Sequence, residues 1–173
     1  RGLAAVKNED WRTVVGEMMA RAPFLGSGLA CAVETLERGG LDFIAAPIPK
    51  NVPLVALCQG ATPEQTARAA RELTAENGYT TLKMKVGGRA VQEDIEKVEA
   101  VAQALTPGAA IRIDANQALS YEDALTLCRA VEDLPIELIE QPFGIDDWKE
   151  MRKLVGATRA PLMLDESIST ADD

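Results

Sequence analysis

The sequence contains no histidine among its 173 residues. This absence excludes from the chain a Ser–His–Asp hydrolase site and any metal site built on imidazole ligands. Cysteine is scarce as well. The three cysteines, Cys31, Cys58 and Cys128, lie far apart, form no Cys-x-x-Cys pair and have apolar neighbours. We therefore expect all three to be small core residues rather than redox or zinc-binding groups.

Long apolar runs and an excess of basic residues are also missing. No run approaches the roughly 20 apolar residues that cross a bilayer, and the first residues lack the pattern of a secretory signal peptide. These features predict a cytoplasmic protein with no membrane partner. The net charge of −9 argues against nucleic-acid binding, which needs a basic surface. With 47% hydrophobic and 26% charged residues, the composition is that of a globular protein.

The first 50 residues follow a helical pattern. Apolar residues at helical spacing predict a helix over residues 10–21, which Pro23 ends, and a second helix from about Ser27 to Gly39. A connector with two prolines, residues 41–51, follows. Helix, helix and connector form one pattern, and the rest of the chain forms another.

From residue 51 onward, apolar strands alternate with amphipathic helices. The expected strands are residues 52–59, 80–87, 109–117, 136–143 and 160–167. Five strands separated by four helices predict right-handed βαβ units and a parallel sheet. We accordingly divide the chain into a first domain over residues 1–50 and a second over residues 51–173.

Charged residues recur at the carboxyl ends of these strands. Lys85, Asp114, Glu140 and Asp165 follow one another at intervals of 29, 26 and 25 residues. A (β/α)₈ barrel has units of about this length and keeps its chemistry at this end. A doubly wound open sheet is the competing fold, although no Gly-x-Gly-x-x-Gly motif follows the first strand. The 122 residues from Val52 onward hold four to five units, so we predict an α/β fold with part of a barrel, truncated after strand five.

The acidic and basic residues at these strand ends suggest a metal site next to a lysine that acts as a base. Lys83 and Lys85 are two positions apart on a strand and point to the same face. Three converging carboxylates repel one another unless a hard cation such as Mg²⁺ binds them. A cation and a neighbouring lysine would lower the pKa of a lysine, so that one of the two could accept a proton. Two alternatives to a metal site remain. The acids at the strand ends could simply be solvated or salt-bridged, or one of the lysines could form a Schiff base as in an aldolase.

Four short motifs carry a resemblance to a known family. "KMK", "DAN", "EQP" and "DES", in this order and at this spacing, resemble the muconate-lactonising-enzyme subgroup of the enolase superfamily. The resemblance implies Asp114, Glu140 and Asp165 as metal ligands. It implies Lys85 as the acid/base residue and Lys83 as the residue that orients the substrate carboxylate. "DES" favours this subgroup over the mandelate-racemase subgroup.

The resemblance extends beyond these five residues. It implies that Asn116 and Gln141 lie near the metal or its ligands, and that residues 1–50 are the last helices of an α+β capping domain. Glu166 could bind the metal in place of Asp165, but strand alternation turns only one of them inward, and the family pattern selects Asp165. The subgroup's second acid/base lysine belongs to a sixth strand, which these residues do not contain.

The resemblance also implies an activity. Members of this subgroup use Mg²⁺, with Mn²⁺ as an alternative, to abstract the α-proton of a carboxylate substrate and form an enediolate. Racemases, epimerases, cycloisomerases and o-succinylbenzoate synthase all match the order of lysines and acids. The segments "DANQ" and "IELIEQP" resemble most the dipeptide-epimerase and succinylbenzoate-synthase branches. A small carboxylate substrate and a homo-oligomer are implied as partners. The alternative is a catalytically incomplete fragment that is inactive or needs partner strands.

Overall fold

The computed structural model describes residues 8–39 and 52–169, and the side chains from Trp11 onward within the first range. The predicted connector over residues 41–51 lies outside them. The chain divides into two compact units, Arg1–Val52 and Pro53–Asp173. Among the described helices, none combines the length and apolar character needed to cross a membrane.

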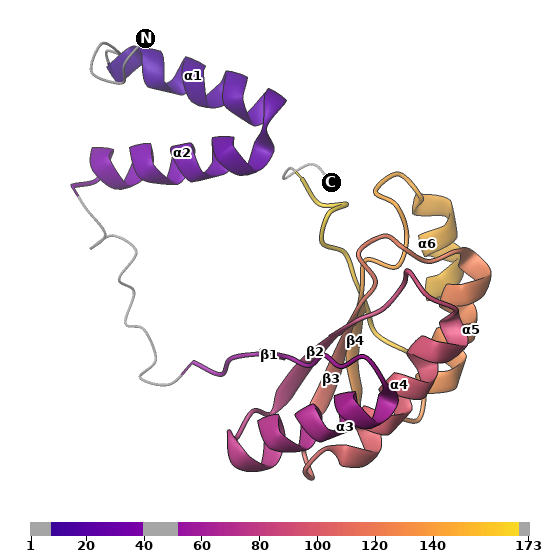
Figure 1. Cartoon of the computed structure of the whole chain (residues 1–173). Helices are drawn as coiled ribbons and strands as arrows, with labels where there is room; N and C mark the ends of the chain where they lie inside the picture. Colours follow the sequence, from indigo (N-terminus) through magenta and orange to yellow (C-terminus); the bar gives the residue numbers. More distant parts are fainter. Residues whose placement is uncertain (1–7, 40–51, 170–173) are drawn as a thin grey trace. The chain divides into compact units, whose positions relative to one another are not determined.

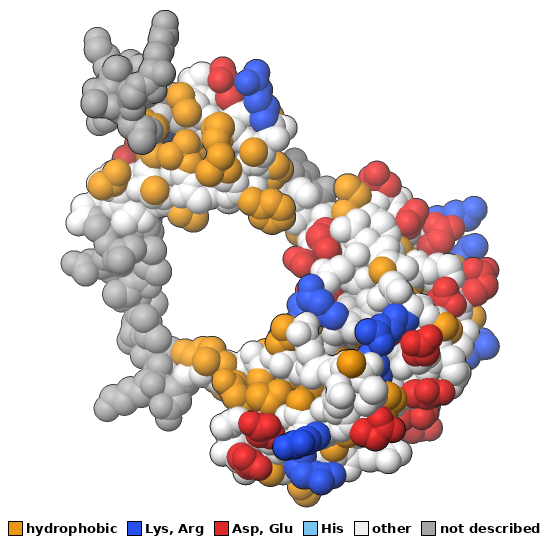
Figure 2. All heavy atoms as spheres, viewed as in Figure 1, with side chains coloured by type: hydrophobic (Ala, Val, Ile, Leu, Met, Phe, Trp, Pro, Cys, Tyr) orange, Lys and Arg blue, Asp and Glu red, His pale blue; other side chains and the backbone are white. Residues whose placement is uncertain are grey.

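The first unit contains two helices, α1 (Asn8–Arg21) and α2 (Pro23–Glu37), that pack against each other (Figure 1). The expected start of the second helix at about Ser27 is wrong, because Pro23 occupies the first turn of α2. Proline fits there since the first helical N–H needs no intrahelical acceptor. Gly26 is buried in the first turn of α2, close to α1: a Cβ at this position would lie 2.6 Å from the backbone nitrogen of Met19. Figure 2 shows hydrophobic side chains gathered on this pair of helices.

The second unit alternates strands and helices as predicted. Its parallel strands are β1 (Ala56–Leu57), β2 (Thr81–Lys85), β3 (Ala110–Asp114), β4 (Ile136–Glu140) and β5 (Leu162–Met163). Its helices are α3 (Pro63–Arg71), the π-helical turn η3 (Glu72–Glu76), α4 (Val91–Ala104), α5 (Tyr121–Val131) and α6 (Trp148–Val155). β1 and β5 have two residues each instead of the predicted eight, since each is hydrogen-bonded to a single neighbour.

The order of the strands identifies the architecture. The strands lie side by side in sequence order, β1-β2-β3-β4-β5. Right-handed crossovers between strands in this order place every helix on the same face of the sheet, and Figure 1 shows α3 to α6 along its outer side. A doubly wound sheet would reverse the strand order and carry helices on both faces. The second unit is therefore an α/β partial barrel, as predicted.

The core lies between the sheet and these helices. Along β2, buried Leu82 and Met84 alternate with Lys83 and Lys85, which turn to the opposite face. Helix residues such as Val98, Leu127 and Leu154 cover the apolar side and are fully buried. Cys58 and Cys128 belong to this core, as expected. The same expectation is wrong for Cys31, which is exposed on α2, because two helices cannot bury every apolar position.

Candidate active site

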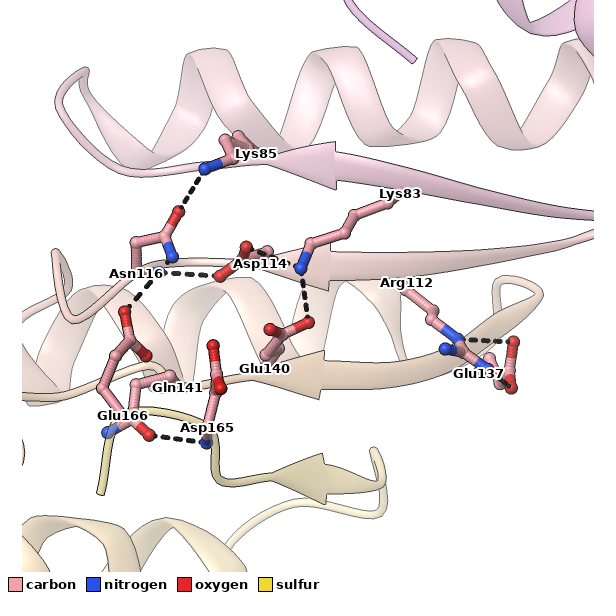
Figure 3. Close-up of polar contacts among 10 residues, drawn as sticks. All are labelled: Lys83, Lys85, Arg112, Asp114, Asn116, Glu137, Glu140, Gln141, Asp165 and Glu166. Atoms are coloured by element: carbon pink, nitrogen blue, oxygen red, sulfur yellow. Dashed lines mark hydrogen bonds and ion pairs between the residues drawn. The ribbon is translucent and has the colours of Figure 1, made fainter. Parts of the chain in front are cut away.

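The ends of neighbouring strands bring the predicted site residues to one edge of the sheet. Lys85 pairs in register with Asp114, and Asp114 pairs with Glu140. The partner of Glu140 on β5 is Met163, so Asp165 lies two residues beyond that level. In Figure 3 the Asp165 carboxylate points toward the end of β4. Lys85, Asp114 and Glu140, which recur at similar intervals in the sequence, therefore lie side by side at one edge of the sheet. Asp165 lies on the loop just beyond this edge.

Lys83 lies between two buried carboxylates. Its Nζ is 2.9 Å from Asp114 Oδ2 and 2.8 Å from Glu140 Oε2 (Figure 3). The side chains of Asp114 and Glu140 are only 2% and 7% exposed. Partial burial by itself would lower the pKa of Lys83, but its hydrogen bonds to Glu140 and Asp114 outweigh burial and raise the pKa. These two ion pairs hold Lys83 in its charged form.

Lys85 has a different environment. Its Nζ donates a hydrogen bond to the side-chain oxygen of Asn116 at 2.8 Å. Asn116 in turn donates from Nδ2 to Glu166 Oε1 at 3.3 Å and from its backbone N–H to Asp114 Oδ1 at 3.0 Å. Asn116 therefore connects the predicted acid/base lysine to two carboxylates.

Gln141 fixes the loop that carries Asp165. Its side-chain oxygen accepts the backbone N–H groups of Asp165 at 2.9 Å and of Ser167 at 3.2 Å. Its side-chain nitrogen donates to Phe143 O and to Ser167 Oγ, at 2.8 and 2.7 Å. The contact of Ser167 with Gln141 was not predicted from the sequence. The signal that could have indicated it is that Ser167 is a polar residue two positions after Asp165, so strand alternation turns both side chains to the same face.

The backbone is bent where β3 and β4 end. Asn116, Gln117 and Gln141 have φ values of 41°, 70° and 38°, a region that side chains other than glycine rarely adopt. The two bends are joined, since the N–H of Gln117 donates to Gln141 O at 2.8 Å. Such strained residues cluster at functional sites when the surroundings hold them in place. Here the bends place the side-chain amides of Asn116 and Gln141 at the edge that carries the carboxylates.

The donor atoms at this edge fit a hard divalent cation. Asp114 and Glu140 already converge on one positive charge, the Lys83 ammonium. Glu166 Oε2 is buried without a hydrogen-bond partner in the described part of the chain, and such an oxygen is costly unless something binds it. Across residues 8–39 and 52–169, however, no three carboxylates are close enough together to form a ready cation site. The structure brings together two of the three predicted ligands and leaves Asp165 exposed.

The fold and this edge define a class: an α/β barrel segment whose strands end in lysine and carboxylate side chains. Residues 65–173 match the family model described as "Enolase C-terminal domain-like". The chain belongs to this family. Its assignment to the enolase superfamily from four short motifs is therefore confirmed.

Individual relatives extend this result. The chain is 37% identical over 131 residues to the o-succinylbenzoate synthase of Thermobifida fusca, covering 74% of this chain and 39% of that protein. A mandelate racemase/muconate lactonizing family protein from Azoarcus sp. EbN1 superposes with a TM-score of 0.76 at 27% identity, covering 94% of this chain and 45% of that one. A dipeptide epimerase from Cytophaga hutchinsonii, complexed with Mg and the dipeptide D-Ala-L-Val, superposes with a TM-score of 0.65 at 28% identity, over 73% and 34% of the two chains.

The synthase and the epimerase are enzymes, and further matches are named as epimerases, racemases and cycloisomerases. The chain spans less than half the length of each of the three proteins described above. Its five strands correspond to part of the barrel of those longer chains.

Proposed function

We propose that this chain carries part of the active site of a Mg²⁺-dependent enzyme that abstracts the α-proton of a small carboxylate substrate. Racemisation, epimerisation, cycloisomerisation or loss of water would follow from that step. The observation that supports this proposal best is the convergence of Asp114 and Glu140 on one cationic centre at the ends of neighbouring strands. Strand ends of this kind hold the chemistry of barrel enzymes.

The proposed cation ligands are Asp114, Glu140 and Asp165. All three offer carboxylate oxygens, which Mg²⁺ prefers. When bound, the cation would stabilise the negative charge that develops on the substrate carboxylate as its α-proton leaves. Gln141 holds the Asp165 backbone, and the single charge of the Lys83 ammonium partly offsets those of the two buried carboxylates.

Lys85 is the proposed base. Its Nζ lies at the edge of the sheet, exposed and anchored to a neutral amide rather than to a carboxylate. An amine held in this way can take the α-proton at Nζ and return it. Lys83 is unsuited to that role, because its ion pairs raise its pKa and keep it protonated. Its place is to balance charge and to contact the substrate carboxylate.

Exchange of the substrate α-proton tests this proposal. The chain with Mg²⁺ in deuterated buffer should introduce deuterium at the α-carbon of dipeptides or N-acylamino acids, measured by ¹H NMR. The Lys85→Met variant should lose this exchange, since it removes the proton acceptor. The control is Lys149→Met, which deletes an exposed lysine elsewhere on the surface. Exchange that survives in Lys85→Met would contradict the assigned role.

A second candidate follows from the open edges of the sheet. β1 and β5 each pair on one side among the described residues, and the sheet has five strands where a closed barrel of this type has eight. The β1 edge also exposes Leu54, Val55 and Leu57, and Figure 2 shows hydrophobic side chains where the chain enters the second unit. Such edges attract further strands. In this alternative the chain is inactive alone and assembles with partner strands, for instance from a second copy.

The two candidates give different results. Light scattering after gel filtration measures the oligomeric state, and the exchange experiment measures catalysis. A folded chain that binds Mg²⁺ but gives no exchange as a monomer would support the second candidate. Exchange by a monomer would exclude it.

A further inference from the structure

Glu166 is a strand-end acid that the proposed chemistry does not use. It follows Asp165 on the loop after β5, and its side chain is partly buried. Its Oε1 accepts a hydrogen bond from Asn116 Nδ2 at 3.3 Å, whereas its Oε2 is buried and has no hydrogen-bond partner among the described residues. Asn116 is also the residue that binds the proposed base, Lys85. Glu166 therefore reaches the base through one intervening amide.

The side chain of Asn116 ends in an oxygen and a nitrogen, and its two neighbours bind one each. Its Oδ1 accepts the hydrogen bond from Lys85 Nζ at 2.8 Å, and its Nδ2 donates to Glu166 (Figure 3). An ionised carboxylate only accepts hydrogen bonds. Glu166 therefore favours the amide orientation in which the nitrogen faces it and the oxygen faces Lys85. In the opposite orientation, the amide oxygen and the carboxylate would be two acceptors facing each other.

The orientation of this amide decides whether Lys85 can accept a proton. A neutral lysine amine has two N–H donors and one lone pair, and a base takes its proton at the lone pair. When Asn116 Oδ1 faces Nζ, one N–H donates to the amide and the lone pair remains free. When Nδ2 faces Nζ, the amide N–H donates to the lone pair and blocks it. Without a carboxylate nearby, the second orientation gives the stronger hydrogen bond, because an amine accepts better than it donates.

Gln141 holds the backbone at both ends of this bridge. Its side-chain oxygen accepts the N–H groups of the two residues that flank Glu166, at 2.9 and 3.2 Å. Its backbone oxygen accepts the N–H of the residue after Asn116 at 2.8 Å. Two side chains on anchored backbones lose less conformational entropy when they bind each other. The bridge is therefore preorganised before any substrate arrives.

We propose that Glu166 is a positioning residue: it orients the Asn116 amide so that the lone pair of Lys85 stays free for the substrate α-proton. This inference rests on the proposed function, which assigns the base to Lys85. In this role Glu166 takes no proton and contacts neither the substrate nor the cation. Its whole effect on the reaction passes through Asn116, which makes the proposal testable by combining substitutions at the two positions.

A double-mutant cycle of α-proton exchange with a dipeptide substrate tests this role. Glu166→Gln keeps the shape of the side chain but no longer imposes one orientation on Asn116. Its kcat should fall at least about tenfold with KM nearly unchanged, since a hydrogen bond to a charged group is typically worth at least that factor. Asn116→Gly removes the amide, and glycine accepts the positive φ of this position. In the Asn116→Gly background, Glu166→Gln should cause no further loss.

The matched control is Glu99→Gln, which removes an exposed acid on α4 and should leave kcat unchanged. Losses that add up in the double variant would show that Glu166 does not act through Asn116 and would overturn the proposal, as would a change in KM alone. Calorimetric titration of Mg²⁺ into Glu166→Gln should match the wild type. Weaker binding would assign this carboxylate to the cation and would also overturn the proposal.

NMR spectra of the metal-free protein test the bridge without catalysis. The two Nδ2 protons of Asn116 can be assigned by their absence from Asn116→Gly. One of them should resonate downfield, because it is bonded to a carboxylate, and Glu166→Gln but not Glu99→Gln should remove that shift. Backbone resonances in the same spectra show whether each variant is folded. An unchanged Asn116 signal in Glu166→Gln would overturn the bridge. A wild type that has the shifted proton but exchanges no α-proton would reject the catalytic proposal alone.

Discussion

Two lysines separated by one residue differ in environment because each one faces different partners. From the sequence, Lys83 and Lys85 could be predicted to share a face and to meet strand-end acids. Their individual partners could not, because these depend on the register between three strands that are distant in the sequence. That register places Lys83 Nζ between Asp114 and Glu140, whereas Lys85 meets the amide of Asn116. Lys83 is therefore ion-paired, whereas Lys85 is exposed and hydrogen-bonded to an amide.

Removing the charge of Lys83 should destabilise the fold. In Lys83→Met, Asp114 and Glu140 would remain buried next to each other without their cation, so we expect the free energy of unfolding to fall by about 3 kcal/mol. Urea unfolding followed by circular dichroism measures this loss. Lys149→Met, which deletes an exposed lysine, should change stability by less than about 0.5 kcal/mol. A similar small change in Lys83→Met would show that the ion pairs do not stabilise the fold.

The cysteines provide a pH-dependent prediction. Burial raises the pKa of the Cys58 thiol from 9.0 to about 11. Between pH 9 and 11 the unfolded thiol loses its proton while the folded thiol keeps it, so the contribution of this group to stability falls as the pH rises through that window. The difference in unfolding free energy between wild type and Cys58→Ala should therefore shrink from pH 8 to pH 10, by up to about 1.4 kcal/mol per pH unit above pH 9. A constant difference would contradict the burial-induced shift.

At the scale of elements, periodicity locates the helices and strands but not all of their ends. The central strands β2, β3 and β4 lie where alternation and apolar runs predict them. The edge strands are shorter, since pairing on one side decides their length and no local pattern reports it. The predicted start of α2 is wrong because proline, which ends many helices, also begins them, as Pro23 does here.

The contact between α1 and α2 predicts a difference between two glycines of the same helix. Gly26→Ala would place a Cβ 2.6 Å from the Met19 backbone, so the helices must separate. Gly28→Ala meets no atom within 4 Å and should stabilise α2 by about 0.5–1 kcal/mol, because alanine favours helix. Hydrogen exchange of the α1 and α2 amides should therefore speed up in Gly26→Ala and slow in Gly28→Ala. Equal effects would show that the helices do not pack closely at Gly26.

At the scale of the whole molecule, the repeat of charged residues along the sequence is enough to predict the partial barrel. Intervals of 25–29 residues match one βα unit, and the strand order with helices on one face excludes a doubly wound sheet. The candidate site is less completely predictable. The sequence predicts the acids, but the exposed position of Asp165 and the contacts of Gln141 depend on the loop after β5, whose path no periodicity encodes.

The claim that these strand ends form a cation site can be tested directly by titrating Mg²⁺ into the protein in a calorimeter. Wild type should bind one Mg²⁺ saturably, and Glu140→Gln should lose that binding because it removes a charged ligand. The control is Glu137→Gln on the same strand, where Glu137 pairs with Arg112 at 2.7 Å instead of reaching the site (Figure 3). It should bind Mg²⁺ like the wild type. No binding by folded wild-type protein, or equal binding by Glu140→Gln, would contradict the metal site.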